Sequence, residues 1–533
     1  MSRPFAPTWL AGDSNARALL PGDLLDRAGR RAVAHNAAAR TIHPGALQAA
    51  RELAAQLPDR PARTASLQRL AQGGTAVVVT GQQLGLWLGP LFTLHKAATA
   101  VAAARALEAE TGVPTVPLFW LQSEDHDAAE IDHAWVPRPP GAPVRLHAPL
   151  DGAGRASVGS LQTSPRLLEV LNDLDGLLHG LPHADATLAL LRDTWRPGEP
   201  LGLAVARHID ALLGDHGLVL VDPRHPAMVA AAAPLHRQVV ERHSEIEELL
   251  HQRGAELRAA GFEPQVAVRP GSPLCFVAPA GDGTPRYRLR AQGDGWQVLR
   301  RDGEQSLTDA ELRALPAAAF STSALLRPLL QDLLLPSAAY VGGPAELGYL
   351  AQIQPVYPLL GIPPSCAVGR AGFTWLEGWL QQALAEQGLT IADLQEVAQL
   401  QPDRAALHQQ AQAEADTLHV ALNQALDSVW PQLQQALAQA DPGLDKAGER
   451  ARAQIDDTLV KLLGKMVRAR SAQGLGDASR WQRAQVLCWP QGLPQERFYS
   501  WPWFAARFGV EALTHAALSM PEPFAGQHCV EAL

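Results

Sequence analysis

Val77–His133 reads VVVTGQQLGLWLGPLFTLHKAATAVAAARALEAETGVPTVPLFWLQSEDHDAAEIDH and decides the fold. A short apolar run stops at a glycine-punctuated loop, and a helical segment then leads to a second apolar run that stops at a polar cluster. Two strands joined by a helix make a parallel βαβ unit. Because ligands bind beyond the carboxyl ends of strands in open α/β sheets, both polar ends are expected at a functional site.

The composition is that of a globular protein of two or three domains. The chain has 533 residues, of which 47% are hydrophobic and 19% charged. A net charge of -9 without a long basic run disfavours nucleic acid as a partner. The four cysteines (Cys275, Cys366, Cys488 and Cys529) are far apart, which favours free thiols over a zinc site and a reducing, cytoplasmic location.

Neither a signal peptide nor a membrane span is expected. Residues 1–13 lack a basic region followed by an apolar core. No apolar run reaches the roughly 18 residues that a membrane helix needs.

The order of predicted elements indicates one doubly wound α/β core with helical and small β insertions and a helical arm. Core strands are predicted near residues 77, 116, 218, 338 and 365, with a further candidate near 486. The predicted parts are N-terminal helices and the first half of the core at 1–136, a mostly helical connecting insertion at 137–216, a core strand and long helix at 217–262, a small antiparallel β insertion at 263–310, the second half of the core at 311–395, an antiparallel coiled-coil arm at 396–475, and a C-terminal return to the core at 476–533.

The first loop contains the candidate ligand contacts Gly81, Gln82, Gln83, Gly85 and Gly89. It matches neither the P-loop nor the dinucleotide fingerprint. Glycines let a backbone approach a ligand, and the helix that follows offers unpaired N–H groups. A tight turn without a ligand remains the alternative.

Lys96 lies one turn into the helix after this loop and is the only lysine before residue 446. A compact ammonium at this place is a candidate anion contact. A solvated helix face is the alternative.

The second polar cluster is the strongest catalytic candidate. Three carboxylates and an imidazole within four residues repel or perturb one another unless they face water, a cation or a substrate amine. The cluster therefore predicts either metal binding or general-base chemistry, whereas a helix cap formed with Ser123 is the alternative. The candidate catalytic residues are Glu124, Asp125, His126 and Asp127.

A third group lies after residue 320. Arg327 is surrounded by apolar residues, which favours either recognition of a carboxylate or phosphate or an internal ion pair with Asp332. A glycine pair before a helix is a second possible anion cradle. The candidate substrate-binding residues here are Ser321, Arg327, Tyr340, Gly342, Gly343, Glu346, Tyr349 and Arg370. Near the C-terminus, Gln495, Glu496 and Arg497 either line a nucleotide or seal the core.

Five ordered motifs together resemble one family. GQQxGxxxGP with a helical lysine, FWxxSEDHD, LLRPLLQDxLLP, YVGGPAExxY and a late QER are similar to the bacillithiol-biosynthesis cysteine-adding enzymes, a family of cysteine ligases. The chain departs from the family pattern at Gln122, at Gly369 before Arg370, and at Pro494 in the late motif.

The resemblance implies a fold and an activity. It implies a Rossmann-like core, a coiled coil that forms a homodimer, and attachment of L-cysteine to the amine of glucosaminyl malate. It also implies a nucleotide pocket, so an adenine nucleotide (ADP or ATP) is a candidate cofactor, whereas no metal is assigned. The anionic substrate would contact Lys96, Arg327 and Arg370. A proton would pass to His126 or a neighbouring carboxylate, and the ammonium of cysteine would bind Glu124, Asp127 or Glu346.

Two other classes of function stay open on residue chemistry alone. One is a nucleotide- or metal-dependent transferase of other specificity. The other is a non-enzymatic assembly protein that acts through the coiled coil.

Overall fold

The structure is a computed structural model that describes residues 3–22, 24–139, 141–152, 156–280, 285–300, 303–396, 404–441 and 444–533. The chain divides into two compact units. The first comprises Met1–Pro137, Val144–Gly378 and Pro494–Leu533, and the second comprises Arg138–Pro143 and Trp379–Leu493. Within the described part of the chain, no helix is long and apolar enough to cross a bilayer.

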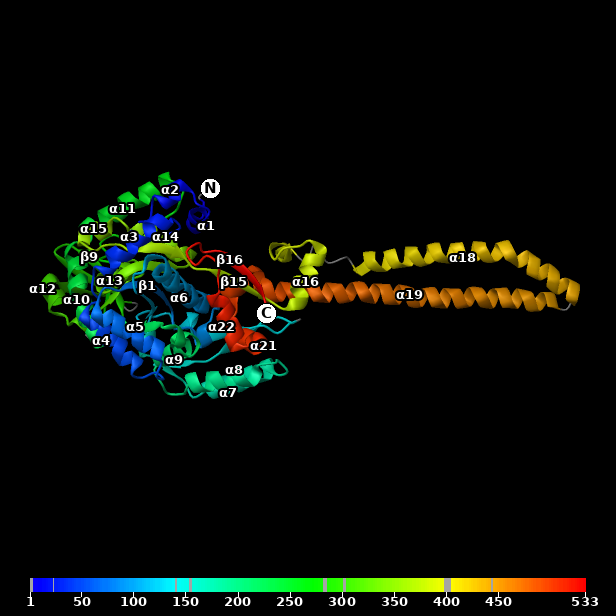
Figure 1. Ribbon diagram of the computed structural model, residues 1–533, viewed down its shortest axis with the longest axis horizontal. Coiled ribbons are helices and arrows are strands. Elements are labelled where there is room, and N and C mark those ends of the chain that lie inside the picture. The colour runs from blue at the N-terminus through cyan, green and yellow to red at the C-terminus, as the bar shows by residue number, and fades with distance from the viewer. Residues whose placement is uncertain are drawn as a thin grey trace. The chain divides into compact units, whose positions relative to one another are not determined.

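A parallel five-stranded sheet forms the centre of the first unit (Figure 1). Its strands are β1 (Ala76–Gln82), β2 (Thr115–Leu121), β7 (Val219–Val221), β13 (Ser337–Gly342) and β14 (Cys366–Gly369). These segments are nearly continuous apolar runs because both faces of a parallel sheet are covered by helices. The five core strands predicted from the sequence are confirmed.

The strand order is β14-β13-β1-β2-β7, and every neighbouring pair is parallel. The chain builds one half outward from β1 through β2 to β7 and then the other half from β13 to β14. This is the doubly wound order, and it confirms the predicted fold class. The topological switch point lies between β1 and β13, where such sheets bind ligands beyond their carboxyl ends.

Alternate residues of β1 bury their side chains on opposite faces of the sheet. Val78 packs on one face with residues of α3 (Arg27–Ala38) and α6 (Phe92–Thr111). Val77 and Val79 pack on the other face with residues of α4 (Pro44–Ala54) and α10 (Pro226–Glu241). The two helical layers thus close both faces of the sheet.

The N-terminal segment is helical, as predicted. Two of its helices begin at a proline, Pro44 and Pro61, which is a favoured residue in the first turn. The remaining helices of the first unit of four or more residues are α1 (Phe5–Leu10), α2 (Ser14–Arg17), α5 (Pro61–Gln72), α7 (Leu167–Leu178), α8 (Ala184–Thr194), α9 (Leu201–Leu213), α11 (His243–Ala259), α12 (Asp309–Ala314), α13 (Leu326–Leu334), α14 (Pro344–Ile353), α15 (Val356–Leu360), α20 (Gln495–Phe498), α21 (Pro502–Phe508) and α22 (Val510–Leu518).

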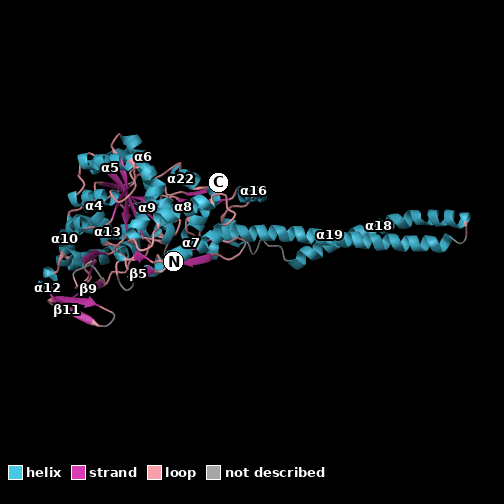
Figure 2. Cartoon of the chain, turned by 90° about the horizontal axis from the view of Figure 1, so that it is seen from below, coloured by secondary structure: helices cyan, strands magenta, loops and turns pink. Residues whose placement is uncertain are grey.

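A second, antiparallel sheet has the order β11-β10-β9-β8-β12. Its strands are β8 (Cys275–Val277), β9 (Tyr287–Gln292), β10 (Gly295–Leu299), β11 (Glu304–Thr308) and β12 (Phe320–Thr322). Figure 2 labels β9 and β11 of this sheet. The predicted antiparallel character is confirmed, although β12 lies beyond the boundary predicted at residue 310.

Three short strand pairs complete the first unit. They are β3 (His133–Val136) with β4 (Val144–His147), β5 (Leu150–Asp151) with β6 (Gln162–Thr163), and β15 (Gly372–Leu376) with β16 (His528–Ala532). The last pair is parallel and joins the C-terminal segment to the strand that follows the core.

The second unit contains α16 (Gly378–Gln387) and a hairpin of the long helices α18 (Arg404–Ala440) and α19 (Asp445–Cys488), which lie side by side in Figures 1 and 2. The predicted coiled-coil arm is confirmed as a helical hairpin. The candidate strand near residue 486 is wrong, because α19 continues through Val486 to Cys488. A short apolar run does not distinguish a strand from a helix end.

Gly81 in β1 lies opposite Trp120 in β2, and a Cβ atom added there would lie 2.5 Å from the carbonyl oxygen of Trp120. We expect Gly81→Ala to lower the free energy of unfolding by about 1–3 kcal/mol, because the backbones must separate. Thermal denaturation followed by circular dichroism measures the effect. Gly176→Ala is the matched control, because a Cβ added at this position in α7 meets nothing within 4 Å. It should raise stability by up to about 1 kcal/mol. Equal effects of the two substitutions would contradict the close-approach argument.

Candidate active site

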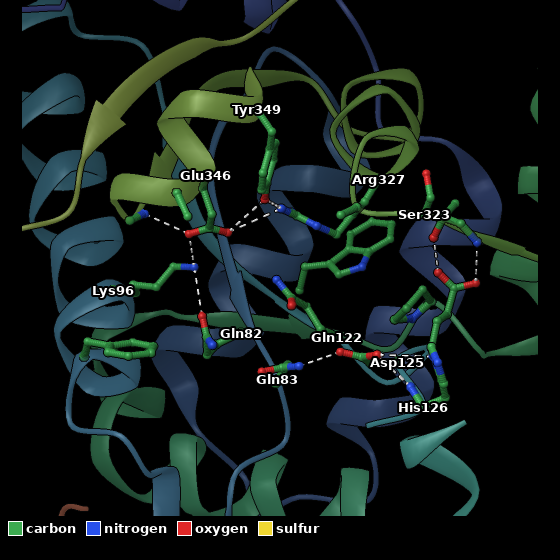
Figure 3. A pocket seen from close by; sticks show the side chains of 18 of the residues that line it. Gln82, Gln83, Lys96, Gln122, Asp125, His126, Ser323, Arg327, Glu346 and Tyr349 are labelled. Carbon is green, nitrogen blue, oxygen red and sulfur yellow. Dashed lines mark hydrogen bonds and ion pairs between the residues drawn. The ribbon is translucent and has the colours of Figure 1, made fainter. Parts of the chain in front are cut away.

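A cavity of about 450 Å³ lies at the carboxyl ends of the parallel strands (Figure 3). Segments that follow all five strands of the sheet contribute to its wall. The lining residues are Gln82, Gln83, Phe92, Lys96, Trp120, Gln122, Glu124, Asp125, His126, Pro223, Phe276, Arg286, Thr322, Ser323, Ala324, Arg327, Gly343, Pro344, Ala345, Glu346, Tyr349, Arg370 and Arg497. The acids and imidazole after β2 therefore share one pocket with the cations predicted elsewhere in the chain.

Glu346 is the centre of a buried ion-pair network, which we call the Glu346 cluster and which comprises Lys96, Arg327, Tyr340, Glu346 and Tyr349. One carboxylate oxygen, Oε2, accepts from Lys96 Nζ at 2.5 Å and from the Gly343 backbone N–H at 2.8 Å. The other, Oε1, accepts from Tyr340 at 2.6 Å, Tyr349 at 3.2 Å and Arg327 at 3.3 Å.

The two cations fix the charge of this carboxylate. Burial alone would raise the pKa of Glu346, but Lys96 and Arg327 outweigh it and hold that pKa at about 2. Burial lowers the pKa of Lys96 to about 8, so its ammonium stays mostly protonated at neutral pH. Two cations against one carboxylate leave the cluster with one net positive charge.

Lys96 has no hydrogen-bond donor left for a ligand. Its ammonium has three protons. Nζ lies 2.5 Å from Glu346 Oε2 and 3.1 Å from Gln82 Oε1, and it also donates to the carbonyl oxygen of Gly81. With a side chain only 1% exposed, Lys96 orients Gln82 and Glu346. A substrate anion would feel its charge without replacing these bonds.

Asp125 and His126 form the more open part of the site. Asp125 accepts from Gln83 Nε2 at 2.5 Å and from the His126 backbone N–H at 2.7 Å. The His126 Nδ1 atom lies 3.6 Å from Asp125 Oδ1. About a third of each side chain is exposed, so both can meet a substrate and exchange a proton.

Glu124 is held by the second sheet. Its carboxylate accepts from the Thr322 backbone N–H at 3.3 Å and from the Thr322 hydroxyl. The Arg286 guanidinium donates to the backbone carbonyls of both Glu124 and Thr322 and lies 4.0 Å from the centre of the Phe276 ring. Burial raises the pKa of Glu124. Glu124 is therefore more easily protonated than an exposed glutamate.

The residues of the late QER motif differ in their surroundings: two are buried in the core, and the third is exposed to the cavity. Gln495 uses its amide to pair with the backbone N–H and C=O of Trp375 at 2.8 and 3.1 Å. Glu496 forms a bidentate ion pair with Arg370 at 2.6 and 2.7 Å and accepts from His95. Arg370 and His95 hold the pKa of Glu496 well below its usual value despite its burial. We therefore assign Gln495 and Glu496 to sealing the core, whereas Arg497 faces the cavity.

The glycines predicted as ligand contacts in the first loop lie outside the cavity wall. A Cβ at Gly85 would lie 2.0 Å from the Gly89 carbonyl oxygen, and a Cβ at Gly89 would lie 2.3 Å from the Ser500 hydroxyl. The structure thus explains Gly81, Gly85 and Gly89 by close packing, and only Gln82 and Gln83 of this motif reach the cavity.

Five other candidates also lie outside the lining. Ser123 donates to the Asp222 carboxylate, and Tyr340 donates to Glu346. Gly342 ends β13, and Ser321 is buried in β12. The Asp127 side chain is exposed and caps no helix through a hydrogen bond. Asp127 therefore lies outside the cavity lining, and Ser123 and Tyr340 each bond a carboxylate from outside that lining.

The site also contains residues that the sequence did not single out. Phe276 and Thr322 are in strands of the second sheet, Arg286 directly precedes β9, and Ser323 follows β12. Arg286 is in an arginine-rich segment whose sequence is typical of an exposed insertion. Nothing in the local sequence indicates that this side chain is buried. Within the described part of the chain, no group of three or more His, Cys, Asp or Glu side chains is placed to hold a metal ion.

A doubly wound α/β core with an acid–imidazole pair and cations at its switch point defines an enzyme of the Rossmann-like class. Residues 32–371 match "Bacillithiol biosynthesis BshC, N-terminal Rossmann-like domain", and residues 373–532 match "Bacillithiol biosynthesis BshC, C-terminal coiled-coil domain". The chain belongs to the bacillithiol biosynthesis BshC family.

Relatives that match over most of their length agree with this assignment. Three proteins named "Putative cysteine ligase BshC" come from Solibacter usitatus, Koribacter versatilis and Salinibacter ruber. They are 35%, 34% and 31% identical to this chain, over 86%, 87% and 90% of it. The matched regions cover 84%, 85% and 87% of the relatives. The predicted resemblance and the prediction of a ligase are confirmed.

The Glu346 cluster predicts how the free energy of unfolding depends on pH. We expect Glu346→Gln to lower the free energy of unfolding by about 3–5 kcal/mol at pH 7, because two buried cations lose their carboxylate. The pKa of Glu346 is lowered on folding, so its contribution is complete above about pH 4.5 and is lost as the pH falls toward 2. The difference in the free energy of unfolding between wild type and variant should therefore become smaller below pH 4.5. Urea denaturation at pH 7, 4 and 3 measures this difference.

The matched control is Glu248→Gln, which changes an exposed glutamate whose recorded side-chain bond is to Gln252. It should leave the free energy of unfolding within about 0.5 kcal/mol of wild type. A constant difference for Glu346→Gln from pH 7 to 3 would show that its carboxylate is not held ionised by the two cations.

Proposed function

We propose that this chain is a cysteine ligase that joins the carboxyl group of L-cysteine to the amine of glucosaminyl malate in bacillithiol biosynthesis. The main support is one cavity that holds an acid–imidazole pair beside several cations, in a chain whose relatives are named for cysteine ligation. An amide-forming reaction between an amino acid and an anionic amino sugar needs both kinds of group.

The charge of the cavity suits an anionic acceptor. Five cationic side chains and three carboxylates line it, so the wall is positive overall. Lys96 and Arg370 are engaged by protein acceptors, and Arg327 is bonded to Glu346, Tyr349 and Gln331. Arg497 is exposed and lines the cavity. Arg497 is therefore the cation of this wall that is open to a ligand, whereas the buried cations act on the substrate through their field.

Asp125 is the best partner for the ammonium of cysteine. Its two oxygens each accept one recorded hydrogen bond, so each keeps a lone pair for a further donor. Glu346 already accepts five hydrogen bonds, which argues against the ammonium contact considered from the sequence. Asp127 is outside the cavity lining.

His126 is the proposed proton acceptor. The sugar amine must be neutral to attack the carbonyl carbon of cysteine, and it loses a further proton as the C–N bond forms. The carboxyl group of cysteine must arrive activated, so that the activating group leaves when the amide forms. His126 lies beside Asp125, which would place the base next to the bound amino acid.

An adenine nucleotide is a candidate for this activation. Of the three late-motif residues predicted to bind it, only Arg497 faces the cavity, and one guanidinium suits a phosphate or a carboxylate equally. The late-motif residues alone therefore do not identify a nucleotide contact.

Substitution of His126 tests the function and the role together. Purified protein is incubated with glucosaminyl malate and cysteine, with and without ATP, and the amide is quantified by mass spectrometry. We expect His126→Ala to lower kcat by about 10²–10⁴, the usual contribution of a general base. Asp127→Asn should keep nearly full activity, because its carboxylate is exposed and outside the cavity lining.

Absence of the amide in every wild-type arm would refute the proposed substrates. Formation of the amide at the wild-type rate by His126→Ala would refute only the proton-transfer role.

We also propose that the helical arm forms a homodimer. Large apolar side chains on α18 and α19 are exposed, among them Val420, Val429 and Leu462 at 56%, 55% and 61%. A hairpin of two helices leaves such residues for a further helix to cover.

Charge introduced on the exposed face should weaken this association. We expect Leu422→Glu/Val429→Glu, which alters two exposed residues seven positions apart on one face of α18, to shift the protein from dimer to monomer in size-exclusion chromatography with light scattering. Gln412→Glu/Gln435→Glu, which alters exposed polar positions of the same helix, should stay dimeric. A monomeric wild type would exclude the homodimer.

A further inference from the structure

A second cavity, which we call the annex, adjoins the active-site cavity on the side of the antiparallel sheet. It has a volume of about 520 Å³, within the range of small-molecule sites. His126, Phe276 and Arg286 line both cavities, so these side chains form the wall between them. The annex is therefore next to the group that we propose as the base.

The annex is strongly basic. Arg269, Arg286, Arg288 and Arg300 line it, and no Asp or Glu occurs among its described lining residues. Four guanidinium groups around one hollow repel one another and concentrate a positive potential there. An anion that enters the annex relieves this repulsion.

Two of these arginines are available to a ligand. Arg286 donates to the Glu124 and Thr322 carbonyls, and Arg300 bonds the Gln305 side chain. No described residue makes a recorded side-chain hydrogen bond or ion pair with Arg269 or Arg288, and both are exposed. Guanidinium groups bind carboxylates through paired N–H donors.

We propose that the annex binds the malyl dicarboxylate of the acceptor substrate, with Arg269 and Arg288 as its direct contacts. This inference rests on the proposed function for the identity of the acceptor. In a glucosaminyl group the amine is on the sugar carbon next to the one that carries the malyl group. An acceptor with its carboxylates in the annex therefore presents its amine at the wall that contains His126.

The state of the other cations favours this placement. Lys96 and Arg370 have protein acceptors, and Arg327 is tied to Glu346. A dicarboxylate bound against them would compete with internal ion pairs. In the annex it gains two guanidinium partners without breaking a recorded bond. The small sheet would thus recognise the acceptor, while the edge of the parallel sheet holds the reacting groups.

The test measures direct binding and turnover with full-length protein. Titration calorimetry with L-malate, and separately with inorganic phosphate, compares wild type with Arg269→Gln/Arg288→Gln. We expect the double variant to bind malate about tenfold more weakly or worse, since hydrogen bonds to charged groups are lost. Its KM for glucosaminyl malate should rise by a similar factor, while kcat and the KM for cysteine stay at wild-type values.

Arg290→Gln is the matched control. Arg290 is on β9, as Arg288 is, but it bonds Gln297 and Glu304 and does not line the annex. It should bind malate as the wild type does. Equal melting temperatures show that the variants are folded.

The outcomes separate this inference from the proposed function. If glucosaminyl malate is converted but the double variant keeps wild-type malate affinity and KM, the annex assignment is wrong and the function stands. If glucosaminyl malate is not a substrate but the double variant loses malate binding, the function is wrong and the dicarboxylate site stands. Wild-type binding of phosphate in preference to malate would overturn the assignment in favour of a phosphate site.

Discussion

The active site depends on the ion pair between Lys96 and Glu346 across the topological switch point. Lys96 is in the helix after β1, and Glu346 is in the first turn of the helix after β13. The two halves of the doubly wound sheet are therefore joined at the place where they diverge. Because the two side chains are only 1% and 14% exposed, loss of Glu346 would leave the charge of Lys96 without an anionic partner, at a cost that exceeds the value of the pair itself. Arg327 extends the same constraint to α13.

Internal pairing also decides which charged groups are open to substrate. If residue type alone were considered, every lysine and arginine of the cavity would be assigned a contact with the substrate. Hydrogen-bond geometry leaves Lys96 and Glu346 saturated, whereas Asp125 and Arg497 keep capacity for further partners. Buried charges of this kind set the potential of the pocket and the orientation of its neighbours. Partly exposed charges make the contacts, so proposed roles follow exposure as well as residue type.

The sequence predicts the parallel sheet well because local pattern and burial coincide there: a strand covered on both faces is an apolar run, and its polar end marks the site. Val486 shows the limit, since a short apolar run at the end of α19 has the same local pattern as a strand. Arg286 shows another, because its bond to the carbonyl of Glu124 joins residues 162 positions apart and nothing local encodes it. Gly85 was predicted as a ligand contact because glycine permits close approach, but the approaching group is the chain itself.

The antiparallel sheet is therefore a wall of the active site, although its sequence resembles an insertion. Arg286 links the two sheets by donating to the carbonyls of Glu124 on one side and Thr322 on the other. A shift of the small sheet would move the carboxylate of Glu124, which that sheet holds through Thr322. Recognition of the acceptor in the annex, as proposed, would then position Glu124 and His126 through the same contacts. Binding energy from the nonreacting end of the acceptor would thus be used to align the reacting end, which is how remote contacts increase the rate of a chemical step.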